Sequence, residues 1–104
     1  MKQGTLILVP FPFTDLTSQK QRPALVISKA KNNGDYIVVA ISSRKHTPAF
    51  PIETKDLRKG ELPLLSYVRY DKVVTLNEEI FQRVVGELNP QVLRKIIQKF
   101  KALF

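Results

Sequence analysis

The apolar residues of this chain are grouped in runs that are too short for helices and are bounded by glycine, proline or asparagine. The first run is Thr5–Val9, which lies between Gly4 and Pro10. A run this short and this apolar fits a buried β-strand better than a helix. We therefore expect a mainly β protein with six short strands, at Thr5–Val9, Ala24–Ser28, Tyr36–Ser42, Phe50–Glu53, Leu62–Thr75 and Arg83–Leu88.

The segments between these runs carry turn signals. Asn32–Asp35 reads Asn-Asn-Gly-Asp, which is typical of a tight turn, so the strands on either side are expected to pair as an antiparallel hairpin. Asp56–Glu61 is charged, contains Gly60 and is interpreted as a turn. Asn77–Phe81 begins with a capping residue followed by two acidic residues, which predicts a short helical turn.

The C-terminal end of the sequence has helical spacing. Asn89 can cap a helix, and Pro90 fits its first position. Apolar side chains then recur every three or four residues and define one side of the helix. Such a helix packs on a sheet, and a small sheet avoids open edges by curling, so the predicted fold is a small, curved antiparallel barrel with a C-terminal α-helix. The apolar side is formed by Val92, Leu93, Ile96, Ile97, Phe100 and Leu103, and the opposite side by Arg94, Lys95, Gln98, Lys99 and Lys101.

Length and charge limit the functions that are open to the chain. Its 104 residues correspond to one domain, residues 1–104. With 17 Lys+Arg against 9 Asp+Glu, the formal net charge is +8, which points to a polyanion as substrate or partner. Nucleic acid is the leading candidate. The same charge would also suit an acidic protein partner, or would serve solubility alone.

Composition excludes several other chemistries. The chain has no cysteine, which excludes disulfides, thiolate metal ligands and cysteine nucleophiles and favours a reducing cytosol. A single histidine cannot form a histidine metal site, and we expect no metal or other cofactor. The sequence has neither a long apolar span nor a cleavable signal, so we expect a cytoplasmic protein without a membrane partner.

The first candidate functional residue is Arg22, which stands directly before Pro23 where a loop becomes a strand. Proline fixes its own φ and pushes the preceding residue toward extended geometry, so the backbone direction at Arg22 is set. A planar guanidinium with a permanent charge suits the oxygens of a bound phosphate or of a phosphoryl transition state. The alternative is an arginine that ends a strand and is held by a neighbouring carboxylate.

Two further clusters carry polar chemistry. Arg69 and Asp71 stand two residues apart in an expected strand, where they form a structural ion pair or present a cation and a carboxylate to a substrate. Ser42–Thr47 combines hydroxyls, cations and the only histidine, His46. Imidazole suits proton transfer, although a lone loop histidine is more often simply exposed. By the period of two, one face of the strand carries Leu65, Tyr67, Arg69 and Asp71, and the other carries Ser66, Val68, Tyr70 and Lys72.

Six short motifs occur in order along nearly the whole chain. They are Gly4–Val9, Arg22–Ser28, Val38–Ser43, Ser66–Asp71, Thr75–Leu76 and Val85–Leu88. Their order and spacing, together with the closing helix, resemble the PemK/MazF toxin family. Members of that family are SH3-like barrels that dimerise, cleave single-stranded RNA without a metal and are neutralised by an acidic antitoxin. The resemblance implies the same fold, activity, homodimer and partners for this chain.

The resemblance also implies roles for four residues. Arg22 matches the family's catalytic arginine and would stabilise the charge on phosphorus. Ser42 falls where the family usually has a threonine, so a hydroxyl is retained that can donate to the phosphate. Arg69 and Asp71 match an Arg-x-Asp pattern whose members are assigned as acid and base. Because arginine is a poor proton donor, Arg69 is interpreted as a second electrostatic group and Asp71 as the base.

The loop before Arg22 departs from the family pattern. Many members have a histidine, or a Gly-His or Gly-Glu element, in this loop, and residues 13–21 contain no histidine. Either Asp71 acts as the base with less help, or His46 enters from a different loop, or the activity is reduced. The residues expected to bind RNA are Phe13, Ser18, Gln19, Lys20, Ser43, Arg44 and His46.

Four functions remain open at this point. The first is a sequence-selective endoribonuclease that acts as the toxin of a toxin–antitoxin pair. The second is a catalytically silent barrel that binds RNA. The third is a toxin of the same fold that acts on a protein target such as DNA gyrase, although a protein-binding surface has no need for a phosphate site. The fourth is an inactive relative that serves as an antitoxin decoy.

Overall fold

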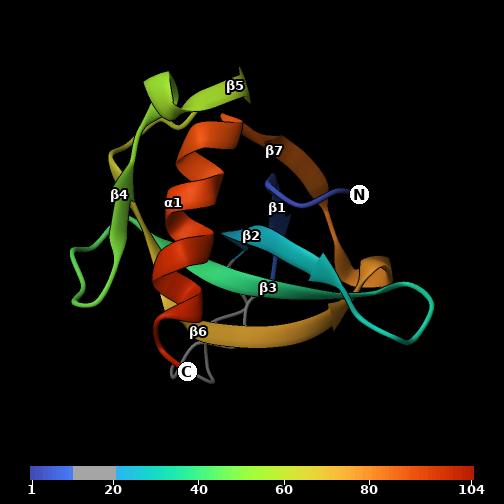
Figure 1. The fold of residues 1–104 in the computed structure, drawn as a ribbon. Coiled ribbons are helices and arrows are strands. Elements are labelled where there is room, and N and C mark those ends of the chain that lie inside the picture. Colours follow the sequence, from blue (N-terminus) through green and yellow to red (C-terminus); the bar gives the residue numbers. More distant parts are fainter. Residues whose placement is uncertain (11–20) are drawn as a thin grey trace.

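The computed structural model describes residues 1–10 and 21–104, and seven strands in these ranges form one antiparallel sheet (Figure 1). The strands are β1 (Thr5–Val9), β2 (Arg22–Lys29), β3 (Asp35–Ser42), β4 (Phe50–Ile52), β5 (Leu57–Gly60), β6 (Ser66–Asn77) and β7 (Arg83–Leu88). Their spatial order is β4-β6-β3-β2-β1-β7-β5. Helix α1 (Pro90–Lys101) follows the last strand, and two short 3-10 helices, η1 (Thr54–Asp56) and η2 (Glu78–Ile80), lie in connections.

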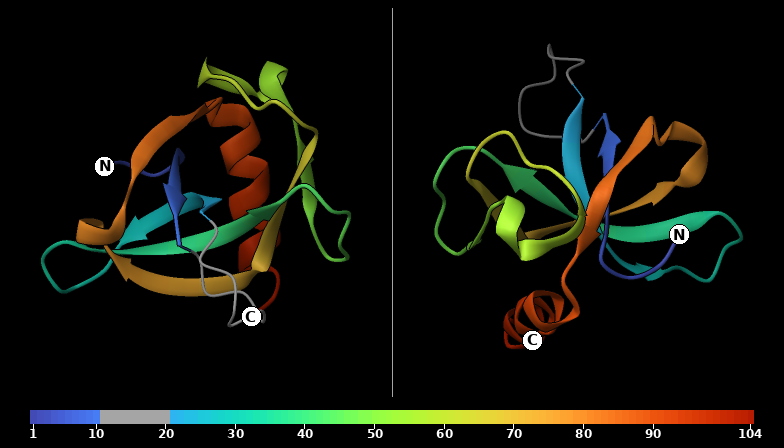
Figure 2. Two further views of the ribbon diagram at one scale, coloured as in Figure 1. Left: turned by 180° about the vertical axis from the view of Figure 1, so that it is seen from behind. Right: turned by 90° about the horizontal axis from the view of Figure 1, so that it is seen from above.

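The strands curl into a half-barrel, and α1 stands against one side of it (Figure 2). The predicted class, a mainly β protein with a small curved antiparallel barrel and a C-terminal helix, is therefore confirmed. Within the described ranges, no helix is long and apolar enough to cross a membrane.

Side chains alternate along the central strands and divide the core into two clusters. On β3, Val39 and Ile41 belong to the cluster against which α1 packs through Ile96. We call this side of the sheet the helix face. Val38 and Ala40 belong to a second cluster, which lines the opposite side, or far face. The register keeps this division across strands, because Val26 of β2 pairs with Val38 and lies in the same cluster.

Several local predictions from the sequence are confirmed. The Asn-Asn-Gly-Asp segment turns the chain between β2 and β3, and Gly34 supplies the positive φ, +84°, that the turn requires. The Asn77 side chain caps η2 by accepting from the Glu79 N–H at 2.9 Å. Asn89 caps α1 in the same way, through the N–H of Gln91 at 3.0 Å, with Pro90 at the first helical position.

Other predictions are wrong in part. The segment Asp56–Glu61 is not a turn, because η1 ends at Asp56 and residues 57–60 form β5, which makes the number of described strands seven instead of six. β5 pairs with β7 on one side only and lies at the edge of the sheet, where charged side chains point to water and no apolar pattern is needed. The long strand also begins later than expected, at Ser66 instead of Leu62.

The alternation along β6 is interrupted by a bulge. Ala40 of β3 pairs with Arg69, and the preceding residue, Val39, pairs with Val73. Three residues of β6, numbers 70–72, therefore stand opposite no residue of β3, and the face that odd-numbered residues occupy changes across the bulge. The predicted period of two holds as far as Arg69, whereas beyond the bulge it is the even-numbered Val74 that packs on the far-face cluster.

Candidate active site

A row of paired residues crosses the middle of the far face. Ile7 of β1 pairs with Ala24 of β2, Ala24 pairs with Ala40 of β3, and Ala40 pairs with Arg69 of β6. Paired residues share a face of the sheet, so all four side chains point to the far face. The two alanines are fully buried, and their short side chains lie on the same face of the sheet as Arg69.

Arg22 and Ser42 lie beside this row, on the same two strands as its alanines. Each stands two residues from an alanine of the row, Arg22 before Ala24 and Ser42 after Ala40, and therefore lies on the same face. The antiparallel register carries the two residues to the same level of the sheet. Arg22 is exposed at the start of β2, and Ser42 is half-buried at the end of β3.

Arg69 is held beside a carboxylate and is largely buried. Its Nη2 lies 3.5 Å from Oδ2 of Asp71, and the two side chains are only 20% and 32% exposed. The Nε of Arg69 is buried, and no hydrogen-bond partner for it is found in the described part of the chain. A buried donor without a partner lowers the stability of the fold. This guanidinium is therefore suited to bind an anionic ligand, to which it can donate hydrogen bonds.

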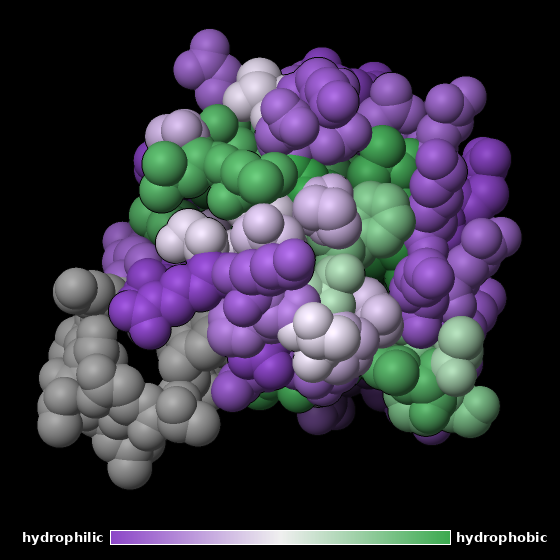
Figure 3. All heavy atoms as spheres, turned by 90° about the vertical axis from the view of Figure 1, so that its left-hand side faces the viewer, coloured by the Kyte–Doolittle hydropathy of each residue, from purple (hydrophilic) through white to green (hydrophobic). Residues whose placement is uncertain are grey.

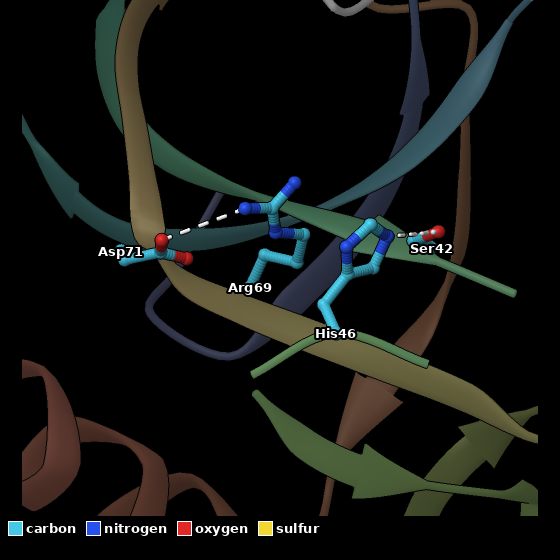
Figure 4. A network of polar contacts seen from close by, with 4 residues as sticks. All are labelled: Ser42, His46, Arg69 and Asp71. Carbon is cyan, nitrogen blue, oxygen red and sulfur yellow. Dashed lines mark hydrogen bonds and ion pairs between the residues drawn. The ribbon is translucent and has the colours of Figure 1, made fainter. Parts of the chain in front are cut away.

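Ser42 joins the loop that follows β3. Its Oγ accepts a hydrogen bond from the backbone N–H of Arg44 at 3.1 Å and lies 3.2 Å from Nε2 of His46. In the view of Figure 4, Asp71, Arg69, His46 and Ser42 follow one another in a line, with the guanidinium between the carboxylate and the imidazole. The loop therefore turns back and brings its histidine to Ser42 at the end of β3.

This arrangement of side chains has the groups needed to bind a phosphate and to transfer protons to and from the oxygens of a bound substrate. Arg22 and Arg69 supply permanent positive charge, and Ser42 supplies a hydroxyl. Asp71 and His46 are groups that can take up and release a proton. In the described ranges, no three His, Asp or Glu side chains are grouped in a way that could hold a metal ion.

The structure places the four residues predicted to be catalytic on the neighbouring strands β2, β3 and β6, on the far face or at its bulge. They are Arg22, Ser42, Arg69 and Asp71, of which Arg69 and Asp71 are in contact. The predicted RNA-binding residues that follow Ser42 are divided: His46 contacts it, and the side chains of Ser43 and Arg44 are exposed. The other predicted RNA-binding residues, Phe13, Ser18, Gln19 and Lys20, lie outside the described residues.

Sequence reasoning missed one residue of this surface. Tyr67 pairs directly with Ser42, is half-buried and lies two residues before Arg69 on the same face. The signal was present in the sequence, because the period of two already placed Tyr67 with Arg69. An aromatic ring beside arginine side chains is suited to stack on a nucleic-acid base.

The fold and the site together define a class of protein: a small curled β-barrel with two arginines, a hydroxyl and a carboxylate on or beside one face of its sheet. Comparison with protein families narrows this class. Residues 2–104 match the model of the PemK-like, MazF-like toxins of type II toxin–antitoxin systems, and the chain belongs to this family. Comparison with curated proteins found no significant match.

Solved structures support the same fold. An endoribonuclease from a mycobacterial species superposes with a TM-score of 0.72 at 20% sequence identity, covering 98% of this chain and 88% of that one. MazF from Deinococcus radiodurans gives 0.69 at 23% identity, with 99% and 94% covered. A mycobacterial endoribonuclease in complex with its cognate antitoxin gives 0.69 at 18% identity, with 99% and 90% covered. The chain is therefore similar in fold to MazF-like proteins along its whole length.

Proposed function

We propose that this protein is a metal-independent, sequence-selective endoribonuclease that cleaves single-stranded RNA, and that it acts as the toxin of a type II toxin–antitoxin pair. The observation that carries the proposal is the guanidinium of Arg69, which is largely buried beside Asp71 with its Nε lacking a partner in the described residues. A phosphate would supply the hydrogen-bond acceptors that such a guanidinium needs. Two of the structurally similar proteins are described as endoribonucleases.

The chemistry needs only groups that the site and the substrate supply. The ribose 2′-hydroxyl attacks the adjacent phosphorus and forms a cyclic phosphate, while the bond from phosphorus to the 5′-oxygen of the next nucleotide breaks. A base must take the proton of the 2′-hydroxyl, and an acid must give a proton to the leaving oxygen. Fixed cations must stabilise the additional negative charge that develops on the phosphate oxygens.

Each role is assigned to a residue of the site. Arg22 and Arg69 stabilise the charge on the phosphate, and Ser42 donates a hydrogen bond to it. Asp71 takes the proton of the 2′-hydroxyl. His46, whose Nε2 lies 3.2 Å from the Ser42 hydroxyl, supplies the second proton carrier and protonates the leaving oxygen.

The flanking nucleotides are bound by residues around this centre. Tyr67 stacks on a base, while Ser43 and Arg44 contact phosphates on the exposed loop after β3. Phe13, Ser18, Gln19 and Lys20, which lie outside the described residues, are assigned to further contacts with RNA. Contacts to several nucleotides at once, with stacking on bases among them, are the proposed origin of the sequence selectivity.

The regulation follows from charge. The net charge of +8 attracts an acidic antitoxin as well as RNA, and an acidic segment that covers Arg22 and Arg69 excludes the substrate. Structurally similar proteins include a MazE–MazF complex from Deinococcus radiodurans. We expect a cytoplasmic homodimer whose expression arrests growth, and a small acidic protein that relieves the arrest. Normal growth with abundant protein present would argue against a toxin.

The experiment that tests the activity incubates purified protein with a long single-stranded RNA in EDTA and maps the cut sites and end groups. Arg22→Ala is the test variant. Arg83→Ala is the matched control, because Arg83 is also exposed but stands on β7, outside the row of site residues. Cleavage at recurrent sequences by the wild type and the control, with cyclic phosphate ends, is the expected result.

Other outcomes separate the alternative functions. Intact RNA that still binds the protein, with weaker binding by Arg22→Ala, would indicate a silent RNA-binding barrel or a decoy for the antitoxin. Protein that neither cleaves nor binds RNA would favour a protein target such as DNA gyrase. Cleavage that EDTA abolishes would contradict the metal-independent mechanism.

A further inference from the structure

The outer side of α1 carries positive charge that the candidate site does not use. From residue 88 to residue 104 the sequence contains no Asp or Glu and four cations, Arg94, Lys95, Lys99 and Lys101. All four are exposed. None of the ion pairs found among the described residues involves any of them. We call these four residues the α1 basic face.

This basic face lies away from the candidate site. The apolar side of α1 packs through Ile96 on the helix face of the sheet, and the candidate site lies on the far face. Seen from above, α1 stands at one side of the molecule and the start of β2, where Arg22 is found, at the opposite side (Figure 2, right). Seen from the side of β4, the molecule is hydrophilic along one edge, with hydrophobic side chains at the lower end of that edge (Figure 3).

Helix electrostatics account for only part of this charge. Lys99 and Lys101 stand in the last turn of α1, where cations are favoured by the helix dipole. That effect is confined to the last turn and gives no advantage to Arg94 and Lys95. Lys95 and Lys99 are moreover one turn apart, a spacing at which like charges repel, and α1 has no acidic residue to offset the repulsion.

The geometry points to the α1 basic face as an auxiliary surface for the phosphate backbone of RNA, which holds segments of a long transcript beyond the cleavage site. This inference rests on the proposed function. A protein partner would need apolar or aromatic anchors beside these cations. The apolar side chains of α1 itself pack toward the sheet, and the exposed Leu103 and Phe104 follow only after the helix has ended. The exposed cations along the helix are suited to a flexible polyanion, which is bound through its charge.

The test compares two double variants that remove the same charge from different places. Arg94→Gln/Lys95→Gln alters the basic face without touching the last turn of α1, and glutamine preserves helix propensity. Lys29→Gln/Lys31→Gln is the control, because both lysines are exposed at the hairpin between β2 and β3. The probe is RNA with 2′-O-methyl groups, which cannot be cleaved because the nucleophile is blocked. It is used both as a long strand and as a short oligonucleotide.

We expect the α1 double variant to bind the long RNA several-fold more weakly than the wild type does. The slope of log K against log salt should fall by about 1.4, since each contact to a single strand contributes about 0.7. Affinity for the short oligonucleotide and cleavage of an unmodified short RNA should not change. The control variant should retain most of the affinity for the long RNA.

Three results would overturn the inference. Equal weakening by the two double variants would show an effect of net charge alone. Unchanged affinity for long RNA would exclude the surface, and lost affinity for anionic lipid vesicles with unchanged RNA binding would assign it to a membrane. If even the wild type fails to cleave unmodified RNA, the proposed activity fails, while binding of the 2′-O-methyl RNA still decides this inference.

Discussion

The guanidinium of Arg69 and the carboxylate of Asp71 lie 3.5 Å apart across a bulge that begins between them. Arg69 is the last residue of β6 in regular register before the bulge, and Asp71 is one of the three residues that β3 leaves unpaired. A bulge changes the direction of the side chains that it carries. Residues two apart on a strand share a face, so Asp71 lies beside Arg69, and the bulge leaves Asp71 without a paired residue on β3.

If Asp71 is the general base, Asp71→Asn will lower the rate of RNA cleavage by about 100-fold or more, since general base catalysis contributes about 10²–10⁴. The substitution keeps the size and the hydrogen-bonding shape of the side chain. The measurement is single-turnover cleavage of one oligonucleotide, with binding of its 2′-O-methyl form as the control. A loss of only about twofold would mean that Asp71 merely orients Arg69, as in an ordinary ion pair.

Ser42 and His46 form the second contact of the site, and their roles can be separated. We expect Ser42→Ala to reduce cleavage by about 10- to 100-fold, the worth of one hydrogen bond to a charged group, and Ser42→Thr to restore most of the rate. His46→Gln can still hydrogen-bond to Ser42 but cannot carry a proton. Full activity of His46→Gln over the whole pH range would contradict its assignment as the acid, whereas a lost limb in the pH–rate profile would support it.

Most of the fold could be predicted because, in most elements, the turn and capping residues agree with the pattern of buried apolar side chains. β7 has the bounds expected from its apolar run, and α1 begins at the expected residue because its start is marked by Asn89 and Pro90. The edge strand β5 escaped prediction, since a strand with one pairing partner and a solvated side needs no apolar pattern. Without an apolar pattern, the charged residues and Gly60 of this segment were interpreted as a turn.

The site could be predicted in composition but not in geometry. Period-of-two reasoning placed Arg69 and Asp71 together, yet the bulge at residues 70–72 is set by the pairing with β3 and leaves no local signature. The approach of His46 to Ser42 depends on the path of the loop after β3. Spacing along the sequence could not distinguish this contact from an exposed loop histidine.

Glu87 joins three segments of the chain, and its loss will destabilise the fold in a salt-dependent way. Its carboxylate is 17% exposed and lies 3.4 Å from Nζ of Lys2 and 3.6 Å from Nε of Arg58. Since both cations are half-exposed, we expect Glu87→Gln to lower the free energy of unfolding by about 1 kcal/mol at low salt and by less at high salt. Urea unfolding at two salt concentrations measures the difference.

The control for this prediction is Glu61→Gln, which removes the same charge from an exposed position that joins none of the ion pairs found among the described residues. Its stability should change little. Equal losses for the two variants would show that net charge matters and that the contacts of Glu87 with Lys2 and Arg58 do not.

The contact of β5 with β7 requires a residue without a Cβ atom at position 86. A Cβ added to Gly86 would stand 2.3 Å from the backbone oxygen of Lys59. Backbone cannot yield as a flexible side chain does, so we expect Gly86→Ala to lower the free energy of unfolding by about 3 kcal/mol and to detach β5 from the sheet. Gly34→Ala is the informative comparison, because Gly34 has a φ of +84° but its nearest neighbour is the side chain of Asn77 at 3.2 Å. That variant bears a backbone strain of about 1 kcal/mol and a contact that a flexible side chain can relieve by a small shift. If thermal unfolding finds Gly86→Ala no less stable than Gly34→Ala, the close packing of β5 on β7 is not a determinant of the fold.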